Sequence, residues 1–452
     1  MGELAIVATI WGVSLSGRHV RGMPAGLRNM SLGLGREHLV IALLMWATHA
    51  RTEREGTAAA LSNPFTFETL ARAGIVLAAF ALVVPLFLQR VRLAQAVRRR
   101  WYGVIFLMIY ASVAVVSITW SSAPMVTAGK ALETSVTFGL AWSLLARRDR
   151  EDALKRTIHL VLFLEGVLIL VAVLGFFLLP SAFAETQSRT GFLFEATLEA
   201  PYLGSNGFSA IGAMLAAFAL ANYFIAGRRR GSSTWLWVVG VGTMSIVLGS
   251  GRQGVAIWVV SIAALLWVYR REIFLLVVAP LATSAVVVYG TEIVTTLERG
   301  QVEGSLNTLT GRTVFWSAAI DAFEDRPITG FGYGAGGRYE ALRRIGLDQY
   351  SHLHNGYLES LVGVGLLGFI PFMLATLRMM WWAGVRLLGR VDTPYAVLVI
   401  PLVLQNAIGM GFGAWLNTHL ILFALVVALS DSLGMRPVRR AARRRSRVAQ
   451  RA

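Results

Sequence analysis

A histidine stands directly before a long apolar segment, in the run Ser351-His352-Leu353-His354-Asn355-Gly356-Tyr357-Leu358. Asparagine is a favoured N-cap, so Asn355 predicts a helix that begins at the next residue. The positive end of the helix dipole disfavours an imidazolium, and it leaves the His354 ring available to accept a proton at neutral pH. His354 is therefore a candidate general base. The alternative is an interfacial histidine that only helps to cap the helix.

An arginine lies between two apolar stretches with almost no loop, in the run Gly249-Ser250-Gly251-Arg252-Gln253-Gly254. Arginine at bilayer depth costs about 2.5 to 3.5 kcal/mol, so Arg252 is expected to face a polar cavity or a partner. A guanidinium offers planar, charge-assisted donors to phosphate oxygens. Arg252 is thus a candidate ligand for a phosphate, and the alternative is a side chain that reaches lipid headgroups.

The composition excludes an ordinary soluble globular enzyme. Of the 452 residues 56% are hydrophobic and 15% charged, whereas soluble domains have about 45 to 50% and about 25%. The chain has no cysteine, which excludes disulfides, zinc-thiolate sites, iron–sulfur clusters and thiol nucleophiles. Three other polar pairs interrupt apolar segments and are expected to make helix-packing contacts: Lys130 with Glu133, Gln405 with Asn406, and Asn417 with His419.

The apolar segments predict an all-α polytopic membrane protein with about twelve transmembrane helices, because each span needs about 20 apolar residues. The predicted spans are 38–49, 72–89, 101–119, 129–146, 157–179, 206–226, 234–249, 253–269, 273–290, 356–377, 394–412 and 416–433. They divide the chain into a cytoplasmic or interfacial segment (1–37), transmembrane helices 1 to 9 (38–290), one large extracytoplasmic loop (291–355), transmembrane helices 10 to 12 (356–433) and a basic cytoplasmic tail (434–452).

The net charge of +17 follows from this topology. With both termini in the cytoplasm, 30 of the 42 Lys and Arg residues fall in cytoplasmic segments, as the positive-inside rule requires. The tail after Met435 has eight arginines and no acid. It is expected to lie on anionic membrane lipids at about 1 kcal/mol per residue, and nucleic acid is a disfavoured partner.

The large loop is expected to contain short helices. Its middle, 311–325, predicts a surface helix with Arg312, Trp316, Ile320 and Phe323 on one face, capped by Thr310. Arg326-Pro327 ends that helix. The glycine-rich run 330–338 is expected to be a tight reversal over the membrane surface. It has no preceding strand, so a dinucleotide-binding fingerprint is rejected.

Taken in order, several motifs resemble the bacterial O-antigen ligase and polymerase superfamily. They cover the chain from about residue 103 to 377: Trp120-Ser121-Ser122-Ala123-Pro124, Ser205-Asn206-Gly207, Gly251-Arg252, Gly311-Arg312 with Trp316, Asp325-Arg326-Pro327, Gly330-Phe331-Gly332-Tyr333-Gly334, His354-Asn355 with Leu358, and Gly363-Val364-Gly365-Leu366-Leu367-Gly368. The chain departs from the family in two ways. Gly251 stands where a serine is common, and the glycine-rich run is longer than usual.

The resemblance implies a metal-independent glycosyltransferase without a soluble cofactor, in the bacterial inner membrane, with its active site facing outward. Its donor would be a glycan linked to undecaprenyl diphosphate, and its acceptor another glycan or lipid-linked glycan. By position, the family roles fall on His354 as the base and on Arg252, Arg312 and Arg338 as diphosphate ligands, with Asn355 orienting the histidine.

The acceptor stays open. It could be another lipid-linked repeat, a lipid A core sugar or a protein side chain, with a slight preference for exopolysaccharide or O-antigen polymerisation. A polyprenyl-linked oligosaccharide flippase or another transporter would also have about twelve spans, but it is expected to show two similar halves, which the sequence lacks. A nonenzymatic scaffold would leave the histidine and arginines without a purpose.

Overall fold

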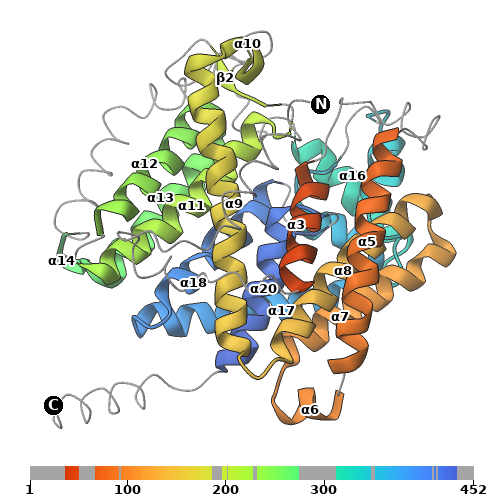
Figure 1. The fold of residues 1–452 in the computed structure, drawn as a ribbon. Helices are drawn as coiled ribbons and strands as arrows, with labels where there is room; N and C mark the ends of the chain where they lie inside the picture. The colour runs from red at the N-terminus through yellow and green to blue at the C-terminus, as the bar shows by residue number, and fades with distance from the viewer. Residues whose placement is uncertain are drawn as a thin grey trace.

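The computed structural model describes residues 36–49, 67–90, 93–185, 196–200, 202–227, 232–273, 312–347, 352–409, 412–413 and 416–434, and these are almost entirely helical (Figure 1). The helices are α3 (Arg36–His49), α5 (Phe67–Arg90), α6 (Leu93–Arg98), α7 (Tyr102–Val116), α8 (Pro124–Leu145), α9 (Arg150–Leu178), α10 (Pro180–Phe183), α11 (Ser205–Ala226), α12 (Ser232–Gly249), α13 (Arg252–Tyr269), α14 (Arg271–Ile273), α16 (Arg312–Asp325), α17 (Gly356–Leu388), α18 (Thr393–Val397), α19 (Val399–Ile408) and α20 (Thr418–Leu433).

Two further helical turns and a small ribbon complete the described structure. A 3₁₀ turn, η1 (Ser117–Trp120), extends α7, and a π-helical turn, η3 (Gly336–Leu342), follows the glycine-rich run. Strands β1 (Ala184–Glu185) and β2 (Thr197–Leu198) pair antiparallel, with Ala184 opposite Leu198.

The prediction of an all-α membrane protein is confirmed. Within the described ranges, six helices are long and apolar enough to cross a membrane: Leu70–Arg90, Tyr102–Trp120, Arg150–Leu178, Ser205–Ala226, Arg252–Tyr269 and Gly356–Leu388. Three shorter apolar helices are Ser233–Gly249, Thr393–Ile408 and Thr418–Leu433. Six candidate spans do not amount to the predicted twelve. The predicted span 273–290, apart from its first residue, lies outside the described residues, as do 1–35, 274–311 and 435–452.

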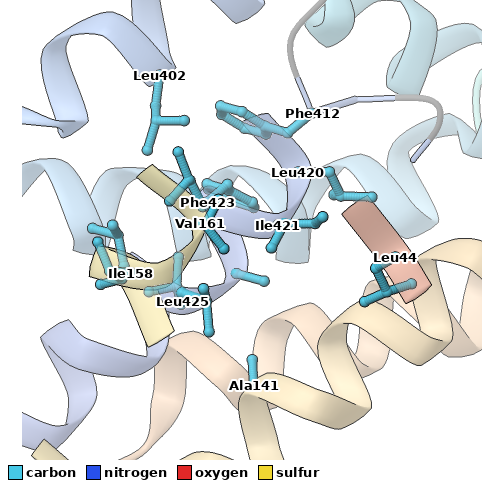
Figure 2. Packing of buried hydrophobic residues seen from close by; sticks show 14 of the residues in the cluster. Leu44, Ala141, Ile158, Val161, Leu402, Phe412, Leu420, Ile421, Phe423 and Leu425 are labelled. Carbon is cyan, nitrogen blue, oxygen red and sulfur yellow. The ribbon is translucent and has the colours of Figure 1, made fainter. Parts of the chain in front are cut away.

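Helix α20 forms the centre of the bundle. Every residue from Leu420 to Leu429 is buried, as expected for a helix that is apolar on all faces. It contacts α7, α8, α9 and α17. Figure 2 shows part of this core, where Phe412 lies flat on Phe423 with ring centroids 3.8 Å apart. The helices that present the polar groups discussed below pack around this axis.

Polar contacts at one end of the bundle join residues that the predicted topology places in the cytoplasm or at the cytoplasmic ends of spans. Glu37 accepts hydrogen bonds from Arg90 and Arg147, each at 3.1 Å. Asp431 accepts the backbone N–H of Val104 at 2.8 Å, so the carboxylate holds the start of α7 against the end of α20.

Contacts at the opposite end join residues that the predicted topology places outside or at the outer ends of spans. Trp120 Nε1 donates to the carbonyl of Thr329 at 3.1 Å, and the backbone N–H of Gly251 donates to Ser209 Oγ at 2.8 Å. Figure 1 shows α16 towards the end of the bundle where α10 and β2 lie, with α6 at the other end. Helix α16, which begins with Arg312, therefore lies towards that end of the bundle.

Candidate active site

The His354 segment begins helix α17 as predicted. The Asn355 side chain is the N-cap, and its Oδ1 accepts the backbone N–H groups of Tyr357 at 3.0 Å and Leu358 at 3.1 Å. His354 precedes it with φ = 56°, a left-handed conformation that is uncommon for a residue other than glycine. The Asn355 carbonyl oxygen accepts the backbone N–H of Glu359 within the helix. The backbone of His354 and Asn355 is therefore fixed relative to α17.

The residue before His354 is held from both sides. Leu353 is fully buried, and its N–H donates to Glu359 Oε1 at 2.6 Å. Its carbonyl oxygen accepts the indole N–H of Trp316 at 3.0 Å. Trp316 belongs to α16 and Glu359 to α17, so both helices determine where His354 lies.

The imidazole of His354 lies among rings. It is nearly parallel to the Phe315 ring, with centroids 6.3 Å apart, and the His352 ring meets it edge-on at 4.1 Å. Phe315 lies one turn after Arg312 on α16. One helix therefore supplies both a ring beside the candidate base and a candidate phosphate ligand.

Helix α16 has the predicted length, and its buried face only partly coincides with the predicted face. It ends at Asp325, before Arg326-Pro327, as expected, whereas its predicted cap Thr310 lies outside the described residues. The buried residues are Phe315, Ala318, Ala319 and Ala322. Of the residues predicted on one face, Trp316 and Phe323 pack against this cluster, whereas Ile320 is 49% exposed. The buried face is offset from the predicted one because α17 and η3 pack against the small alanines.

Arg312 is tied to the end of α19. Its Nη1 donates a hydrogen bond to the carbonyl oxygen of Ile408, the last residue of that helix. The final carbonyls of a helix lack partners within the helix and carry negative partial charge, so a guanidinium is favourable there.

Arg252 begins α13 at a closely packed turn. Next to it, Gln253 Nε2 donates to the carbonyl of Asn206 at 3.4 Å. A Cβ on Gly409 would lie 2.6 Å from Gln253 Oε1 and 2.7 Å from Gln405 Nε2. The turn that carries Arg252 thus reaches the residue directly after Ile408, where Arg312 is bound.

The start of α17 also contacts α19. A Cβ on Gly356 would overlap the side chain of Asn406, whose Oδ1 accepts the backbone N–H of Phe412 at 2.8 Å. Segments that carry His354, Arg312 and Arg252 therefore meet on the last two turns of α19.

Arg338 approaches the His354 segment from a different side. It lies on η3, half-buried, with its guanidinium 5.3 Å from the centre of the Tyr339 ring. Its charge acts on the carboxylate of Glu359. Arg338 is therefore connected to His354 through Glu359 and Leu353.

The glycine-rich run is more buried than a surface reversal. Gly332 donates its N–H to the carbonyl of Gly363 at 2.8 Å, and Leu366 donates to Pro327 at 2.8 Å. These bonds flank Gly365, where α17 kinks with φ = 58°. The run pairs with the kinked backbone of α17, and its position relative to the membrane surface stays a prediction.

Two sets of polar residues were not assigned to the candidate site from the sequence. Glu359 has a recognisable signal, since it is an acid in the first turn of an otherwise apolar helix. The second set was predicted to make only packing contacts, or was given no role. It comprises buried amide atoms that have no hydrogen-bond partner among the described residues: Gln253 Oε1, Gln405 Oε1 and Asn406 Nδ2. Within the described part of the chain, no group of three or more His, Asp or Glu side chains is placed to hold a metal ion.

Comparison with known proteins identifies the segment that carries these residues. Residues 236–373 match the family model described as O-antigen ligase. The predicted resemblance to the O-antigen ligase and polymerase superfamily is confirmed. The O-antigen ligase match contains Arg252, Arg312, Arg338, His354 and Asn355, whereas α19 and the start of α11 lie outside it.

A curated relative points to the same superfamily. The chain is 33% identical over 104 residues to the exopolysaccharide production protein ExoQ of Rhizobium meliloti (strain 1021). That alignment covers 21% of this chain and 24% of the relative.

Proposed function

We propose that the protein is a metal-independent membrane glycosyltransferase of bacterial surface polysaccharide assembly. It transfers or polymerises glycan from an undecaprenyl-diphosphate carrier onto an acceptor sugar hydroxyl. The observation that carries the proposal is the meeting of the His354 segment, Arg312 and the Arg252 turn at the end of α19. The O-antigen ligase match over 236–373 supports it.

The proposed reaction uses a base and fixed positive charge. The acceptor hydroxyl oxygen attacks the anomeric carbon, and His354 takes its proton. The bond between that carbon and the phosphate oxygen breaks, and the diphosphate leaves with the bonding electrons. Diphosphate is a good leaving group that needs charge neutralisation more than a proton, so preorganised guanidinium donors suit it. Arg252, Arg312 and Arg338 fill this role.

The backbone around His354 orients the ring. Asn355 caps α17, and Leu353 is bonded on both sides. The His352 ring packs against the imidazole with centroids 4.1 Å apart, and the Phe315 ring lies nearly parallel to it at 6.3 Å. A base held in this way needs little reorganisation when the acceptor arrives.

The proposed topology has about twelve transmembrane helices in the bacterial inner membrane, with the active site facing the periplasm and both termini in the cytoplasm. The loop 291–355 lies outside, and the tail 434–452 lies on anionic lipids. Support comes from the separation of the described polar contacts into two ends and from the 30 of 42 basic residues in cytoplasmic segments. The polyprenyl chain is accommodated between apolar helices, and the relative's name favours exopolysaccharide as the product.

Reconstitution tests the function directly. Purified protein in vesicles is given an undecaprenyl-diphosphate-linked glycan together with candidate acceptors, and the products are analysed by mass. A lengthened lipid-linked chain is the expected polymerase product, and a modified core lipid identifies a ligase. Movement of intact donor across the vesicle without a new glycosidic bond would instead identify a flippase and refute the proposal.

A further inference from the structure

Glu359 is a buried acid at the candidate active site to which neither the proposed reaction nor the family roles assign a task. It lies in the first turn of α17 and is 6% exposed. Burying a carboxylate is costly unless hydrogen bonds compensate. A buried carboxyl group at this position is therefore expected to have a role, and its contacts indicate which role.

One carboxylate oxygen acts on the backbone of the His354 segment. Oε1 accepts the N–H of Leu353 at 2.6 Å, a short hydrogen bond. The bond spans the reversal between residues 353 and 359 and fastens the extended segment to the helix that follows it.

The other carboxylate oxygen fits against a glycine. A Cβ on Gly337 would overlap Oε2 of Glu359, so the residue at position 337 must be a glycine for the carboxylate to take this position. Arg338 follows, and its positive charge acts on the same carboxylate. Turn η3 therefore packs against Oε2 of Glu359, whereas Leu353 binds Oε1.

His354 depends on this arrangement for its unusual backbone. A left-handed conformation is unfavourable for a residue with a Cβ, and it persists only where the surroundings enforce it. Here the residue before His354 is bonded to Glu359 and Trp316, and the residue after it caps α17. Loss of the hydrogen bond from Leu353 to Glu359 would remove one of the contacts that hold the His354 backbone in this conformation.

We propose that Glu359 is a positioning residue that sets the backbone at Leu353 and thereby aims the His354 imidazole at the acceptor hydroxyl. This inference rests on the proposed function, in which His354 is the base. Glu359 does not itself touch the reacting atoms, since its oxygens face the Leu353 N–H and Gly337. The required property is an acceptor oxygen at Oε1, which an amide also supplies.

The test compares three variants in the reconstituted transfer assay. Glu359→Gln keeps an acceptor oxygen, and its kcat is expected to stay within about threefold of wild type. Glu359→Ala removes the acceptor, and its kcat is expected to fall by about 100-fold, the loss that a displacement of about 1 Å produces. Its KM for the lipid-linked donor should change by less than about twofold. The control is Glu340→Gln on η3, which pairs with Arg344 at the surface and should behave as wild type.

A fourth variant distinguishes loss of the contacts at Leu353 from misfolding of the Glu359→Ala protein. Trp316→Phe keeps a ring but removes the N–H that binds the Leu353 carbonyl. It should lower kcat by about tenfold, as expected from loss of one hydrogen bond of about 1 to 1.5 kcal/mol, with donor KM close to wild type. The protein should still unfold cooperatively, at a slightly lower melting temperature than wild type.

Two results would overturn the inference. Unchanged kcat in Glu359→Ala would show that the bond to Leu353 is not needed for transfer. Equal loss in Glu359→Gln and Glu359→Ala would show that the negative charge matters instead of the acceptor. In both cases His354→Ala separates the two proposals, because an inactive His354→Ala leaves the proposed function standing and an active one removes it.

Discussion

The Arg312 guanidinium binds the backbone carbonyl of Ile408, 96 positions further along the chain. This bond joins the first turn of α16 to the last turn of α19. Gly409, the next residue, is closely packed against Gln253 beside Arg252. Helix α19, which lies outside the O-antigen ligase match, therefore contacts residues that lie inside the match and helps to position them.

Replacing the candidate base tests the proposed chemistry. His354→Ala is expected to lower transfer by at least about 100-fold, the lower range for general-base catalysis, while the yield and melting temperature of the purified protein stay near wild type. The assay is formation of the new glycosidic bond in vesicles. His352→Ala, at the neighbouring ring, is the matched comparison. Wild-type turnover in His354→Ala would remove the base from the mechanism.

Lysine at the candidate phosphate ligands tests whether guanidinium geometry matters. Arg312→Lys and Arg252→Lys keep the charge but lose the planar fork. A loss of about 1.5 to 3 kcal/mol of charged hydrogen bonding corresponds to about 10- to 100-fold in kcat/KM. Arg343→Lys, at an exposed arginine of the same loop, should retain wild-type kinetics. Unchanged kinetics in both site variants would contradict the diphosphate role.

Local sequence signals were sufficient for some parts of the site. The N-cap at Asn355, the end of α16 at Asp325 and the apolar helices follow from spacing and capping within a few residues of each other. Contacts between residues far apart in the sequence could not be predicted from these signals. The packed face of α16 is selected by α17 and η3, and the role of α19 depends on a contact between residues far apart in sequence.

The buried amide of Gln405 is expected to cost stability. The side chain is 4% exposed, and its Oε1 has no hydrogen-bond partner among the described residues. An unsatisfied buried polar group costs about 1 to 3 kcal/mol, so Gln405→Leu should raise the melting temperature in detergent. Gln253→Leu is the contrasting variant, because it also loses the bond to Asn206. A lower melting temperature for Gln405→Leu would show that the amide is satisfied.

A surface carboxylate at the opposite end predicts a pH effect. A hydrogen bond from Arg147, the largest influence, lowers the pKa of Asp149 below its ordinary value. Because the folded pKa is depressed, the carboxylate stabilises the fold above its unfolded pKa of about 3.9. That contribution is lost as the pH falls through the folded pKa. The difference in melting temperature between wild type and Asp149→Asn should therefore be present at pH 7 and shrink below about pH 4. A difference that grows in acid would contradict this sign.

The departure from the family at Gly251 has a steric cause. A Cβ there would lie 2.7 Å from the Cβ of Ser209, whose hydroxyl accepts the Gly251 N–H at 2.8 Å. Gly251→Ser introduces the residue common in the family, yet it should destabilise this protein by about 1 to 3 kcal/mol through overpacking.

Combination with a second substitution makes this prediction specific. Ser209→Gly removes the opposing Cβ, so the double variant should recover part of the stability lost in Gly251→Ser, measured by thermal unfolding. Gly240→Ser in α12 is the control, since a Cβ there meets nothing within 4 Å. Additive losses in the double variant would show that Ser209 is not the obstacle to a side chain at position 251.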